Sequence, residues 1–240
     1  SHIRIIFLFL LKKNCREPVE SPRIHIVIAD DHAVTRFGFK QWIQMSLKDR
    51  QPEPVLSDVG TGAQVLDFVR SAETSDCPVT MLIIDVDLPD MLGIQVVREL
   101  RKKGFQGAVL VVSGSHRADI YEILDSGANG FLSKEEEHTI FLEAVMWLLE
   151  HPTETWLTPA LHRRIFQTDK ALHKVGITPA ERNVLRFIAL SNKEIADKLG
   201  SSESTIKKHL WSIFQKLGIE SREEARDFAT GIQLLDAPRR

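Results

Sequence analysis

Three acidic residues, each at the end of a strand-like apolar run, are the residues of this 240-residue sequence best suited to chemistry. Asp30 and Asp31 follow the run Ile24–Ala29, and Asp85 follows the run Met81–Ile84. Carboxylates gathered at one edge of a buried sheet repel one another unless a cation lies between them. Mg²⁺ prefers oxygen ligands, takes few of them from the protein and often shares a phosphate. These residues therefore predict a metal site that handles phosphoryl groups.

A hydroxyl and an ammonium complete the predicted site. Ser113 ends the run AVLVVS, and Lys134 ends the run GFLSK. Such groups can hold phosphoryl oxygens while a metal neutralises the remaining charge, and Asp85 is then placed as a nucleophile toward phosphorus. Each residue alone has an ordinary interpretation, because an Asp after a strand is often a helix cap and a Lys is often a solvated charge. Five such residues at four strand ends favour one shared site.

The elements that position these residues follow from alternating apolar runs and helical periods. We expect strands near residues 24–29, 54–59, 79–85, 108–112 and 130–133, and helices near 33–47, 62–72, 92–102, 117–126 and 137–150. This alternation predicts an α/β fold with a parallel sheet covered on both faces. In the flavodoxin-like (βα)5 strand order 2-1-3-4-5, the first and third strands are neighbours and ligands bind at that switch point. That order would bring Asp30, Asp31 and Asp85 together.

Composition limits the class of protein. Hydrophobic residues make up 43% of the chain and charged residues 27%, which fits a globular protein with a substantial core. The two cysteines, Cys15 and Cys77, match no disulfide or zinc spacing and favour a reducing cytoplasm. The apolar segment Ile5–Leu11 is far shorter than the ~18 residues that span a bilayer, and Lys12-Lys13 stand where a signal peptide would be cleaved. We therefore expect a cytoplasmic protein without a membrane partner, and the pattern assigns no role to this segment.

The pattern changes after Glu150, where we expect a domain boundary. Residues 23–150 form the predicted α/β domain, residues 151–176 a linker, and residues 177–237 an all-α domain of four short helices. His151-Pro152 stops the preceding helix. Within the linker we expect a short helical piece near Pro159–Phe166, followed by a polar stretch through Lys174.

Three of the four predicted helices begin with capping boxes, in which a hydroxyl accepts from a backbone amide and a Glu reaches back to the cap. The boxes are Thr178–Glu181, Ser191–Glu194 and Ser221–Glu224. Residues 172–240 carry 12 Lys and Arg against 9 Asp and Glu, whereas residues 1–171 carry 19 against 24. A mildly basic second half after an acidic first half suits a polyanion-binding part that follows a metal-binding part.

The segment Ser191–Leu210 is predicted to form a helix, a tight turn and a second helix, which runs from about Glu203 to Leu217. Apolar residues at spacings of four, three and four form one buried stripe of this second helix, namely Ile206, Leu210, Ile213 and Leu217. The opposite face carries Ser204, Lys207, Lys208 and Trp211. A basic, acid-free face after a tight turn suits the DNA major groove, although a solvated face of an ordinary helix has the same pattern.

A set of residues in the first domain resembles the receiver domain of two-component response regulators, namely Asp30-Asp31, Asp85 with Leu88-Pro89 and Gly93, Ser113-Gly114, and Lys134 after Gly127-Ala128-Asn129-Gly130-Phe131. The resemblance implies phosphoryl transfer from a histidine kinase to Asp85. It implies Mg²⁺ held by Asp31, Asp85 and the backbone carbonyl of Asp87, with Asp30 contributing through water. Ser113 would shift toward the phosphoryl group and Phe131 would turn inward behind it, a two-state change that a local charge can bias.

The second domain resembles the LuxR-type helix-turn-helix in the segments SNKEIA at 191–196, STIKKH at 204–209 and KLG at 216–218. Together with a receiver, this domain is typical of the NarL/FixJ subfamily of transcriptional regulators. The resemblance implies that Lys207 and Lys208 face the groove of double-stranded promoter DNA. It also implies supporting positions that approach the DNA backbone or brace the helix, namely Lys193, Thr205, His209 and Lys216. The last helix, Arg222–Leu235, would pair two protomers into a homodimer on DNA.

The sequence departs from the family pattern at several positions. Glu135 follows the site lysine where Pro is frequent, and Phe131 replaces the more frequent Tyr. Asp87 adds an acid beside the nucleophile at a position that tunes the lifetime of the aspartyl phosphate. Compared with the family pattern, about two residues are absent before Ser191; if this is a real deletion, we expect it to rotate the scaffold helix and to weaken DNA binding. Trp211 is unexpected on the exposed face; contact with a sugar or a thymine methyl, contact with a partner, and partial cover by neighbouring side chains all fit.

We thus expect a phosphorylation-switched, DNA-binding transcriptional regulator rather than an enzyme. One alternative is a phosphatase, because Ile84-Asp85-Val86-Asp87 is similar to the nucleophile motif of haloacid-dehalogenase-type enzymes. That motif normally ends a first strand, however, and no later Gly-Asp-x-x-x-Asp follows. Another alternative is a DNA-binding module whose receiver acts only as a fixed dimerisation platform. The pattern leaves open the operator, the kinase and its signal, and whether transcription rises or falls.

Overall fold

The computed structural model describes residues 23–114 and 119–235, so the apolar segment Ile5–Leu11 and Cys15 lie outside the described ranges. The chain divides into two compact units, Ser1–Leu157 and Thr158–Arg240, and each unit is described by itself. Among the described residues, no helix has both the length and the apolar character needed to cross a membrane.

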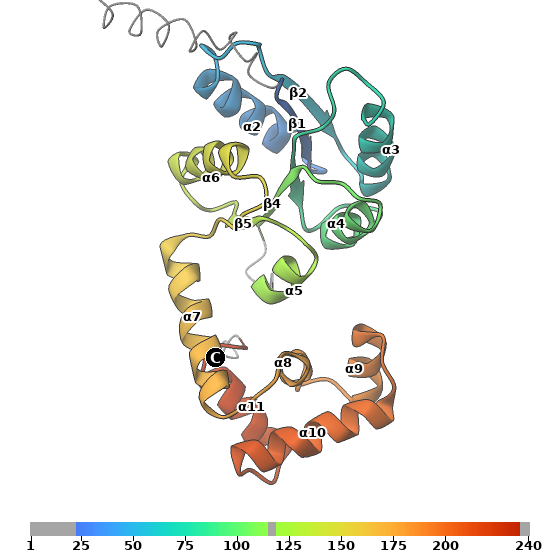
Figure 1. Ribbon diagram of the computed structural model, residues 1–240, viewed down its shortest axis with the longest axis vertical. Helices are drawn as coiled ribbons and strands as arrows, with labels where there is room; N and C mark the ends of the chain where they lie inside the picture. Colours follow the sequence, from blue (N-terminus) through green and yellow to red (C-terminus); the bar gives the residue numbers. More distant parts are fainter. Residues whose placement is uncertain (1–22, 115–118, 236–240) are drawn as a thin grey trace, which may run out of the picture. The chain divides into compact units, whose positions relative to one another are not determined.

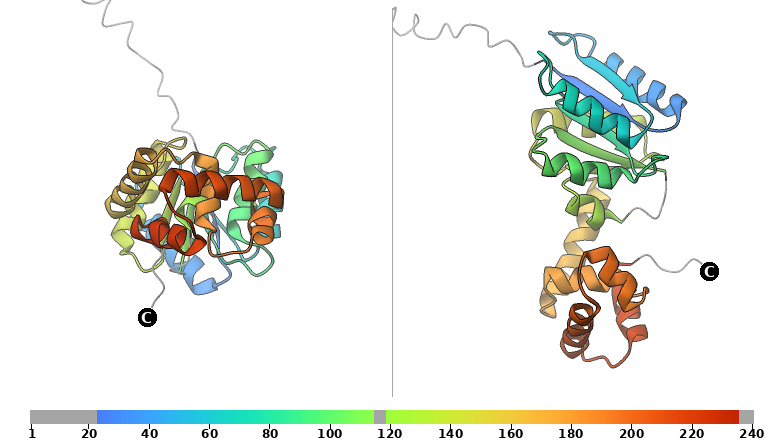
Figure 2. Two further views of the ribbon diagram at one scale, coloured as in Figure 1. Left: turned by 90° about the horizontal axis from the view of Figure 1, so that it is seen from below. Right: turned by 90° about the vertical axis from the view of Figure 1, so that its right-hand side faces the viewer.

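The N-terminal unit is a five-stranded parallel sheet with helices on both faces (Figures 1 and 2). Its strands are β1 His25–Ala29, β2 Val55–Val59, β3 Met81–Asp85, β4 Ala108–Ser113 and β5 Gly130–Ser133. Its helices are α2 Ala33–Ser46, α3 Gly62–Ala72, α4 Gly93–Lys102, α5 Ile120–Asp125 and α6 His138–Glu150. The strand order β2-β1-β3-β4-β5 confirms the predicted flavodoxin-like fold. Helices α2 and α6 cover one face, and α3, α4 and α5 cover the other.

The central strands are buried along their whole length, which explains their unbroken apolar sequences. Every residue of β1, β3 and β4 is buried, as expected for parallel strands with helices on both sides, whereas the edge strand β2 is partly exposed. On the α2–α6 face, the stacked rings of Phe39 and Phe141, 4.4 Å apart, pack over this sheet. Because Ala29 pairs with Ile84, the acids that follow these residues end neighbouring strands at the same edge.

The chain after α6 remains bound to the start of β5, although these residues were expected in the linker. Trp156 forms a parallel bridge with Gly130, and its amide donates to the carbonyl of Asn129 at 2.8 Å. The buried Asn129 side chain donates to the carbonyls of Pro152 and Glu154 at 3.0 and 3.2 Å. The first residues after α6 therefore belong to the N-terminal unit.

The C-terminal unit is helical throughout its regular structure. It contains α7 Pro159–Lys174, α8 Pro179–Arg186, α9 Asn192–Leu199, α10 Glu203–Leu217 and α11 Arg222–Gly231 (Figure 1). The last four confirm the predicted short helices. The expectation of a short helical piece ending near Phe166 was wrong, because α7 is 16 residues long and ends at Lys174.

Helix α7 extends through the polar stretch because its inner face contacts the end of α11. Thr158 caps α7, and Pro159 fits its first position. The hydroxyl of Thr168 donates to the carbonyl of Ile232 at 2.8 Å, while Leu172 is buried. Few apolar residues make this contact, so the hydrophobic pattern indicated only the first two turns.

Two of the three predicted capping boxes form as expected, at Thr178 with Glu181 and at Ser191 with Glu194. At the third, Ser221 accepts from the amide of Glu224, but the Glu224 carboxylate accepts from the Ser221 hydroxyl and from the Glu220 amide instead of the Ser221 amide. Helix α9 ends at Gly200, whose left-handed backbone allows the sharp turn into α10, and α10 ends in the same way at Gly218.

Candidate functional site

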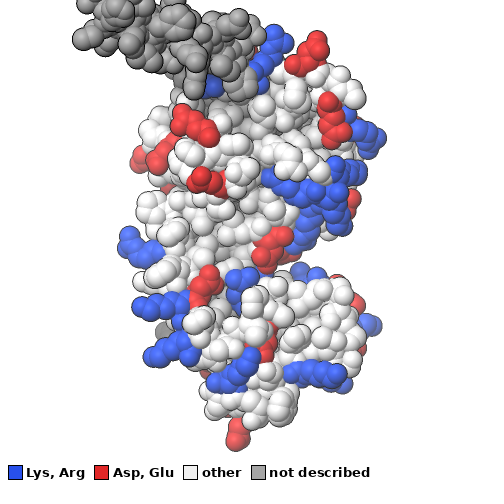
Figure 3. Space-filling view, in the orientation of Figure 1, with Lys and Arg blue, Asp and Glu red and all other residues white. Residues whose placement is uncertain are grey.

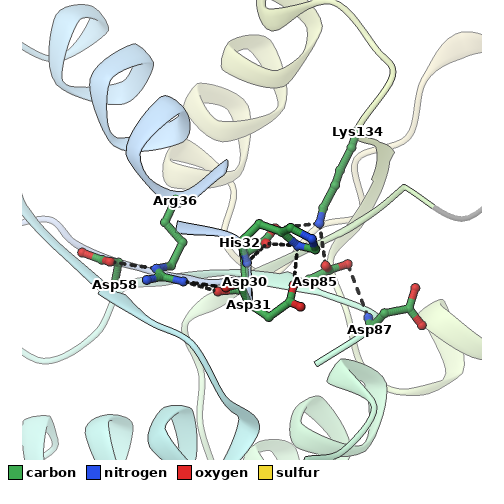
Figure 4. A network of polar contacts seen from close by, with 8 residues as sticks. All are labelled: Asp30, Asp31, His32, Arg36, Asp58, Asp85, Asp87 and Lys134. Atoms are coloured by element: carbon green, nitrogen blue, oxygen red, sulfur yellow. Dashed lines mark hydrogen bonds and ion pairs between the residues drawn. The ribbon is translucent and has the colours of Figure 1, made fainter. Parts of the chain in front are cut away.

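The carboxyl edge of the sheet brings four of the predicted site residues to the ends of four strands. Asp30 follows β1, Asp85 ends β3, Ser113 ends β4 and Lys134 follows β5. Asp30 and Asp85 are 0% and 3% exposed, and Ser113 is also buried. The Lys134 ammonium lies 2.6 Å from Asp30 Oδ2 and 2.5 Å from Asp85 Oδ2, so it bridges the two carboxylates (Figure 4).

Burial and charge together perturb the titration of this bridge. Burial raises the pKa of the Asp85 carboxyl; its bonds to Lys134 oppose this, while the charge of Asp30 adds to it. Burial alone would lower the pKa of Lys134, but its bonds to Asp30 and Asp85 outweigh burial and raise it. One ammonium thus serves two buried carboxylates, which leaves the pocket with excess negative charge.

Asp31 lies at the open side of the pocket. Its side chain is 38% exposed, and one carboxylate oxygen lies 2.5 Å from His32 Nδ1 (Figure 4). Ligand atoms of Asp30, Asp31 and His32 lie within 4.8 Å of one another, close enough to share a metal ion. The sequence did not single out His32 as a neighbour of the site, and its position directly after two acids was the only available signal.

The loop after Asp85 is held against the site and against α3. The amide of Asp87 points to Asp85 Oδ1 at 3.4 Å, and the Asp87 residue itself is exposed. A side chain at Gly93 would place its Cβ 2.0 Å from the backbone carbonyl of Asp85, so only glycine fits there. Asp90 accepts from the first two amides of α3, at Gly62 and Ala63, over 2.7 and 2.8 Å.

The two predicted switch residues, Ser113 and Phe131, lie on neighbouring strands, the first on β4 and the second on the edge strand β5. Ser113 pairs in register with Ser133, and its carbonyl accepts from the Lys134 amide at 2.8 Å. Phe131 pairs with Val111, and its ring is buried at 9% exposure. Backbone bonds therefore connect Ser113, at the end of β4, directly to β5, the strand that carries Phe131 and leads into Lys134.

The second helix of the predicted helix-turn-helix has the two faces that its sequence predicts. Ile206, Leu210 and Ile213 are buried, whereas Leu217, the last residue predicted in this stripe, lies at the end of the helix and is only half-buried. Four of the predicted DNA-contacting residues are exposed on α10, namely Ser204, Lys207, Lys208 and Trp211, and Lys193 is exposed on α9. Thr205 and His209 are half-buried at the border of the two faces. Figure 3 shows basic side chains on the C-terminal unit interspersed with acidic ones, so the face of this unit seen there carries both positive and negative charge.

Lys216 braces α10 against α8. Its ammonium lies 2.8 and 2.6 Å from the two carboxylate oxygens of Glu181, and the Ser212 hydroxyl donates to the same carboxylate at 2.6 Å. Burial opposes ionisation, but these bonds and the cap at Thr178 lower the pKa of Glu181 to about 2. The sequence indicated Glu181 only as a capping residue, because a cross-helix ion pair leaves no local spacing pattern.

The shortened segment before Ser191 is held by Arg222 of α11. Its guanidinium donates to the carbonyl of Ile188 at 2.9 Å, and also to the carbonyl of Leu190 and the side chain of Asn192. Helix α9 forms directly after this turn with Ile195 and Ala196 buried. Arg222 thus supplies donors to carbonyls that the turn leaves without helical partners.

Comparisons with known proteins match both units. Residues 26–146 match the family described as response regulator receiver domain, and residues 176–229 match bacterial regulatory proteins of the luxR family. The nitrate/nitrite response regulator protein NarL of Escherichia coli K12 is 32% identical over 211 residues, which cover 83% of this chain and 92% of that protein. The transcriptional regulatory protein DegU of Brevibacillus brevis is 29% identical, over 87% of this chain and 94% of that protein.

Among solved structures, the RcsB response regulator of Salmonella typhimurium aligns with a TM-score of 0.52 and 20% identity. The alignment covers 88% of this chain and the whole of that chain. At this identity the likeness shows the fold.

Proposed function

Because the chain belongs to the two-component response regulators that join a receiver to a LuxR-type DNA-binding domain and regulate transcription, we propose that phosphorylation of Asp85 by a histidine kinase is its switch. The family is regulatory rather than enzymatic in the usual sense. The observation that carries the proposal is the Lys134 bridge, which joins the two buried acids at the ends of β1 and β3. A solvated surface lysine or a simple helix cap would not be held between two buried carboxylates.

The residues of the pocket fit a hard divalent cation. The proposed ligands are Asp31, Asp85 and the backbone carbonyl of Asp87, with Asp30 acting through water. These are all oxygen donors, and the buried negative charge exceeds what Lys134 supplies. When bound, Mg²⁺ would supply further positive charge for the transferring phosphoryl group.

The proposed reaction is a simple displacement at phosphorus. A carboxylate oxygen of Asp85 forms a bond to phosphorus while the P–N bond of a phosphohistidine breaks, and the leaving imidazole takes up a proton. Lys134 and Ser113 offer donors to the phosphoryl oxygens at the same edge of the sheet. Charge at this edge would then favour the inward position of Phe131, the proposed switch residue.

Intact mass spectrometry tests the phosphorylation. Treatment with acetyl phosphate and Mg²⁺ should add about 80 Da to the wild-type chain and nothing to Asp85→Ala. Asp87→Ala is the matched control, because it removes a neighbouring carboxylate but leaves the proposed backbone ligand. A gain retained by Asp85→Ala, or no gain in the wild type, would reject the proposal.

We further propose that the C-terminal unit binds promoter DNA as a homodimer in the cytoplasm, with α11 and the residues up to Leu235 pairing the protomers. Lys207 and Lys208 are exposed on the same side of α10 as Ser204 and Trp211, opposite its buried stripe. The proposed supporting contacts are Lys193, Thr205 and His209. The ion pair with Glu181 supports the second role that the resemblance allows for Lys216, which is to brace the helix.

Selection from a random DNA pool, with and without prior phosphorylation, tests the DNA-binding proposal. We expect phosphorylation to tighten binding to the recovered sequence. Equal affinity of wild type and Asp85→Asn after phosphorylation would instead favour a receiver that acts only as a dimerisation platform. The phosphatase alternative has no support in the fold, because Asp85 ends β3 rather than β1.

A further inference from the structure

Arg36 of α2 contacts the backbone of both acids that follow β1. Its Nη1 donates to the carbonyl of Asp30 at 2.7 Å and to the carbonyl of Asp31 at 3.2 Å. Its Nε donates to Asp58 Oδ2 at 2.9 Å (Figure 4). The Arg36 side chain is only 19% exposed, so the guanidinium is held within the protein rather than in solvent.

These contacts fix a piece of backbone that the sheet alone does not fix. The Asp30 amide still bonds to the carbonyl of Val59 on β2, but Asp30 and Asp31 lie beyond the last residue of β1. No side chain caps the start of α2 at His32. One guanidinium that binds two consecutive carbonyls restricts the torsions of both residues, and these torsions aim the two carboxylates.

The charge of Arg36 is matched on the adjacent strand. Asp58 of β2 accepts from Arg36 and from Lys40, whose Nζ lies 2.7 Å from Asp58 Oδ1. The bonds to Lys40 and Arg36 together lower the pKa of Asp58, so it stays ionised. The guanidinium therefore reaches the backbone at the site while Asp58 offsets its positive charge.

We propose that Arg36 is a positioning residue for the cation at Asp30 and Asp31, a proposal that rests on the proposed function of that pocket. Arg36 acts through the backbone and does not touch the metal or the phosphoryl group. Substitutions of groups that orient metal ligands typically lower metal affinity about 10- to 100-fold. Lysine cannot replace the planar fork that reaches two carbonyls and a carboxylate at once.

Calorimetric titration of the full chain with Mg²⁺ alone tests this role. Arg36→Lys and Arg36→Gln should each weaken Mg²⁺ binding about 10-fold or more. Lys40→Met is the matched control, because Lys40 contacts the same Asp58 but neither acid of the site, and its Mg²⁺ affinity should equal that of wild type. With acetyl phosphate, the Arg36 variants should recover most of their rate at saturating Mg²⁺.

The outcomes separate the two proposals. Wild-type Mg²⁺ affinity in either folded Arg36 variant overturns the positioning role. A rate that stays low at saturating Mg²⁺ also overturns it, because the defect would then not lie in metal binding. A wild-type chain that binds no Mg²⁺ and accepts no phosphoryl group would instead refute the proposed function. If Arg36→Gln shows no cooperative unfolding and is therefore not folded, the Mg²⁺ affinity of Arg36→Lys, which keeps the positive charge, tests the positioning role.

A second and independent observation concerns Trp211 of α10. The residue is 68% exposed and lies on the same face as Lys207 and Lys208, one helical turn further on. A large apolar ring on a lysine-bearing helical face suits a partner that is anionic at its rim and offers an apolar group at its centre. The major groove is such a surface, because the C5-methyl group of thymine is its apolar feature.

We infer that Trp211 reads a thymine methyl group in the bound DNA, an inference that rests on the proposed DNA binding and names its base preference. The test replaces thymine by uracil at single positions of the selected site, which removes one methyl group and changes nothing else. Wild type should bind one uracil-substituted site several-fold more weakly, while Trp211→Ala should bind both DNAs equally.

Trp211→Phe keeps an apolar ring and should retain part of the discrimination. Equal binding of every uracil-substituted site by wild type overturns the inference while leaving DNA binding established. Discrimination that persists unchanged in Trp211→Ala also overturns it. A wild type that binds no selected DNA refutes the proposed function instead. Fluorescence of Trp211 in a chain whose other three tryptophans are Phe should change on binding to the thymine-containing site.

Discussion

The Glu181–Lys216 pair makes the C-terminal unit sensitive to acid. Glu181 is 4% exposed, and its pKa falls from 4.5 to about 2 in the folded chain. A carboxyl group with a lowered folded pKa contributes stability that is fully present above its unfolded pKa and is lost as pH falls through the folded pKa. The contribution near neutral pH is therefore roughly 3 kcal/mol, lost progressively between about pH 5 and pH 2.

The substitution Glu181→Gln should remove most of this pH dependence. Glutamine keeps an acceptor for Thr178 and Ser212 but leaves the Lys216 ammonium without its counter-charge. The variant should thus be less stable than wild type by roughly 3 kcal/mol at pH 7 and nearly equal to it at pH 2. Urea unfolding of the full chain, followed by hydrogen exchange in peptides of α8 and α10, reports the stability of this unit alone.

Glu194→Gln is the matched control for this measurement. Glu194 forms the same type of capping box, with Ser191, but it is exposed and no described lysine bridges it to another helix. Its substitution should change the pH dependence far less. A difference between wild type and Glu181→Gln that stays constant from pH 7 to pH 2 would refute the assignment of the lowered pKa to the ion pair.

Three further predictions concern the two proposed sites. Because burial raises the pKa of Asp85 in the metal-free pocket, protons should compete with Mg²⁺ for this carboxylate, so the Mg²⁺ affinity should begin to fall, as pH decreases, at a higher pH than for an ordinary aspartate; an affinity that is flat through that range would contradict this. Lys207→Ala should weaken DNA binding and reduce the slope of log affinity against log salt by about one, and an unchanged slope would exclude Lys207 as a phosphate contact. Gly93→Ala should destabilise the N-terminal unit by about 1–3 kcal/mol and slow phosphorylation, because its Cβ would meet the Asp85 carbonyl; thermal unfolding compared with Gly38→Ala in α2, where nothing lies within 4 Å of the added atom, measures the steric part.

The sequence predicted those features that repeat along the chain or end an element. Buried parallel strands need continuous apolar runs, so the strands and the acids at their ends could be read from local pattern, whereas the strand order was taken from the flavodoxin-like fold that this alternation suggests. The extent of α7 could not, because its contacts with α11 depend on Thr168 and a few apolar residues rather than on an apolar stripe. The roles of Arg36 and Glu181 were hidden for a related reason. Each acts on residues 5 to 35 positions away through bonds that leave no period in the sequence.

Strand β5 contacts both the pocket, at its last residues, and the segment 152–156 that leads out of the N-terminal unit, at its first. Its last residues lead into Lys134, which bridges Asp30 and Asp85. Its first residue, Gly130, is bridged to Trp156, and the Asn129 carbonyl accepts from the Trp156 amide. A phosphoryl group on Asp85 would alter the Lys134 contacts, since it converts the carboxylate that Lys134 binds into an uncharged carboxyl group next to charged phosphoryl oxygens. Any shift of β5 that follows either breaks the bonds to Trp156 or moves residues 152–156 with the strand, so the segment that leads into α7 can respond to the phosphoryl group.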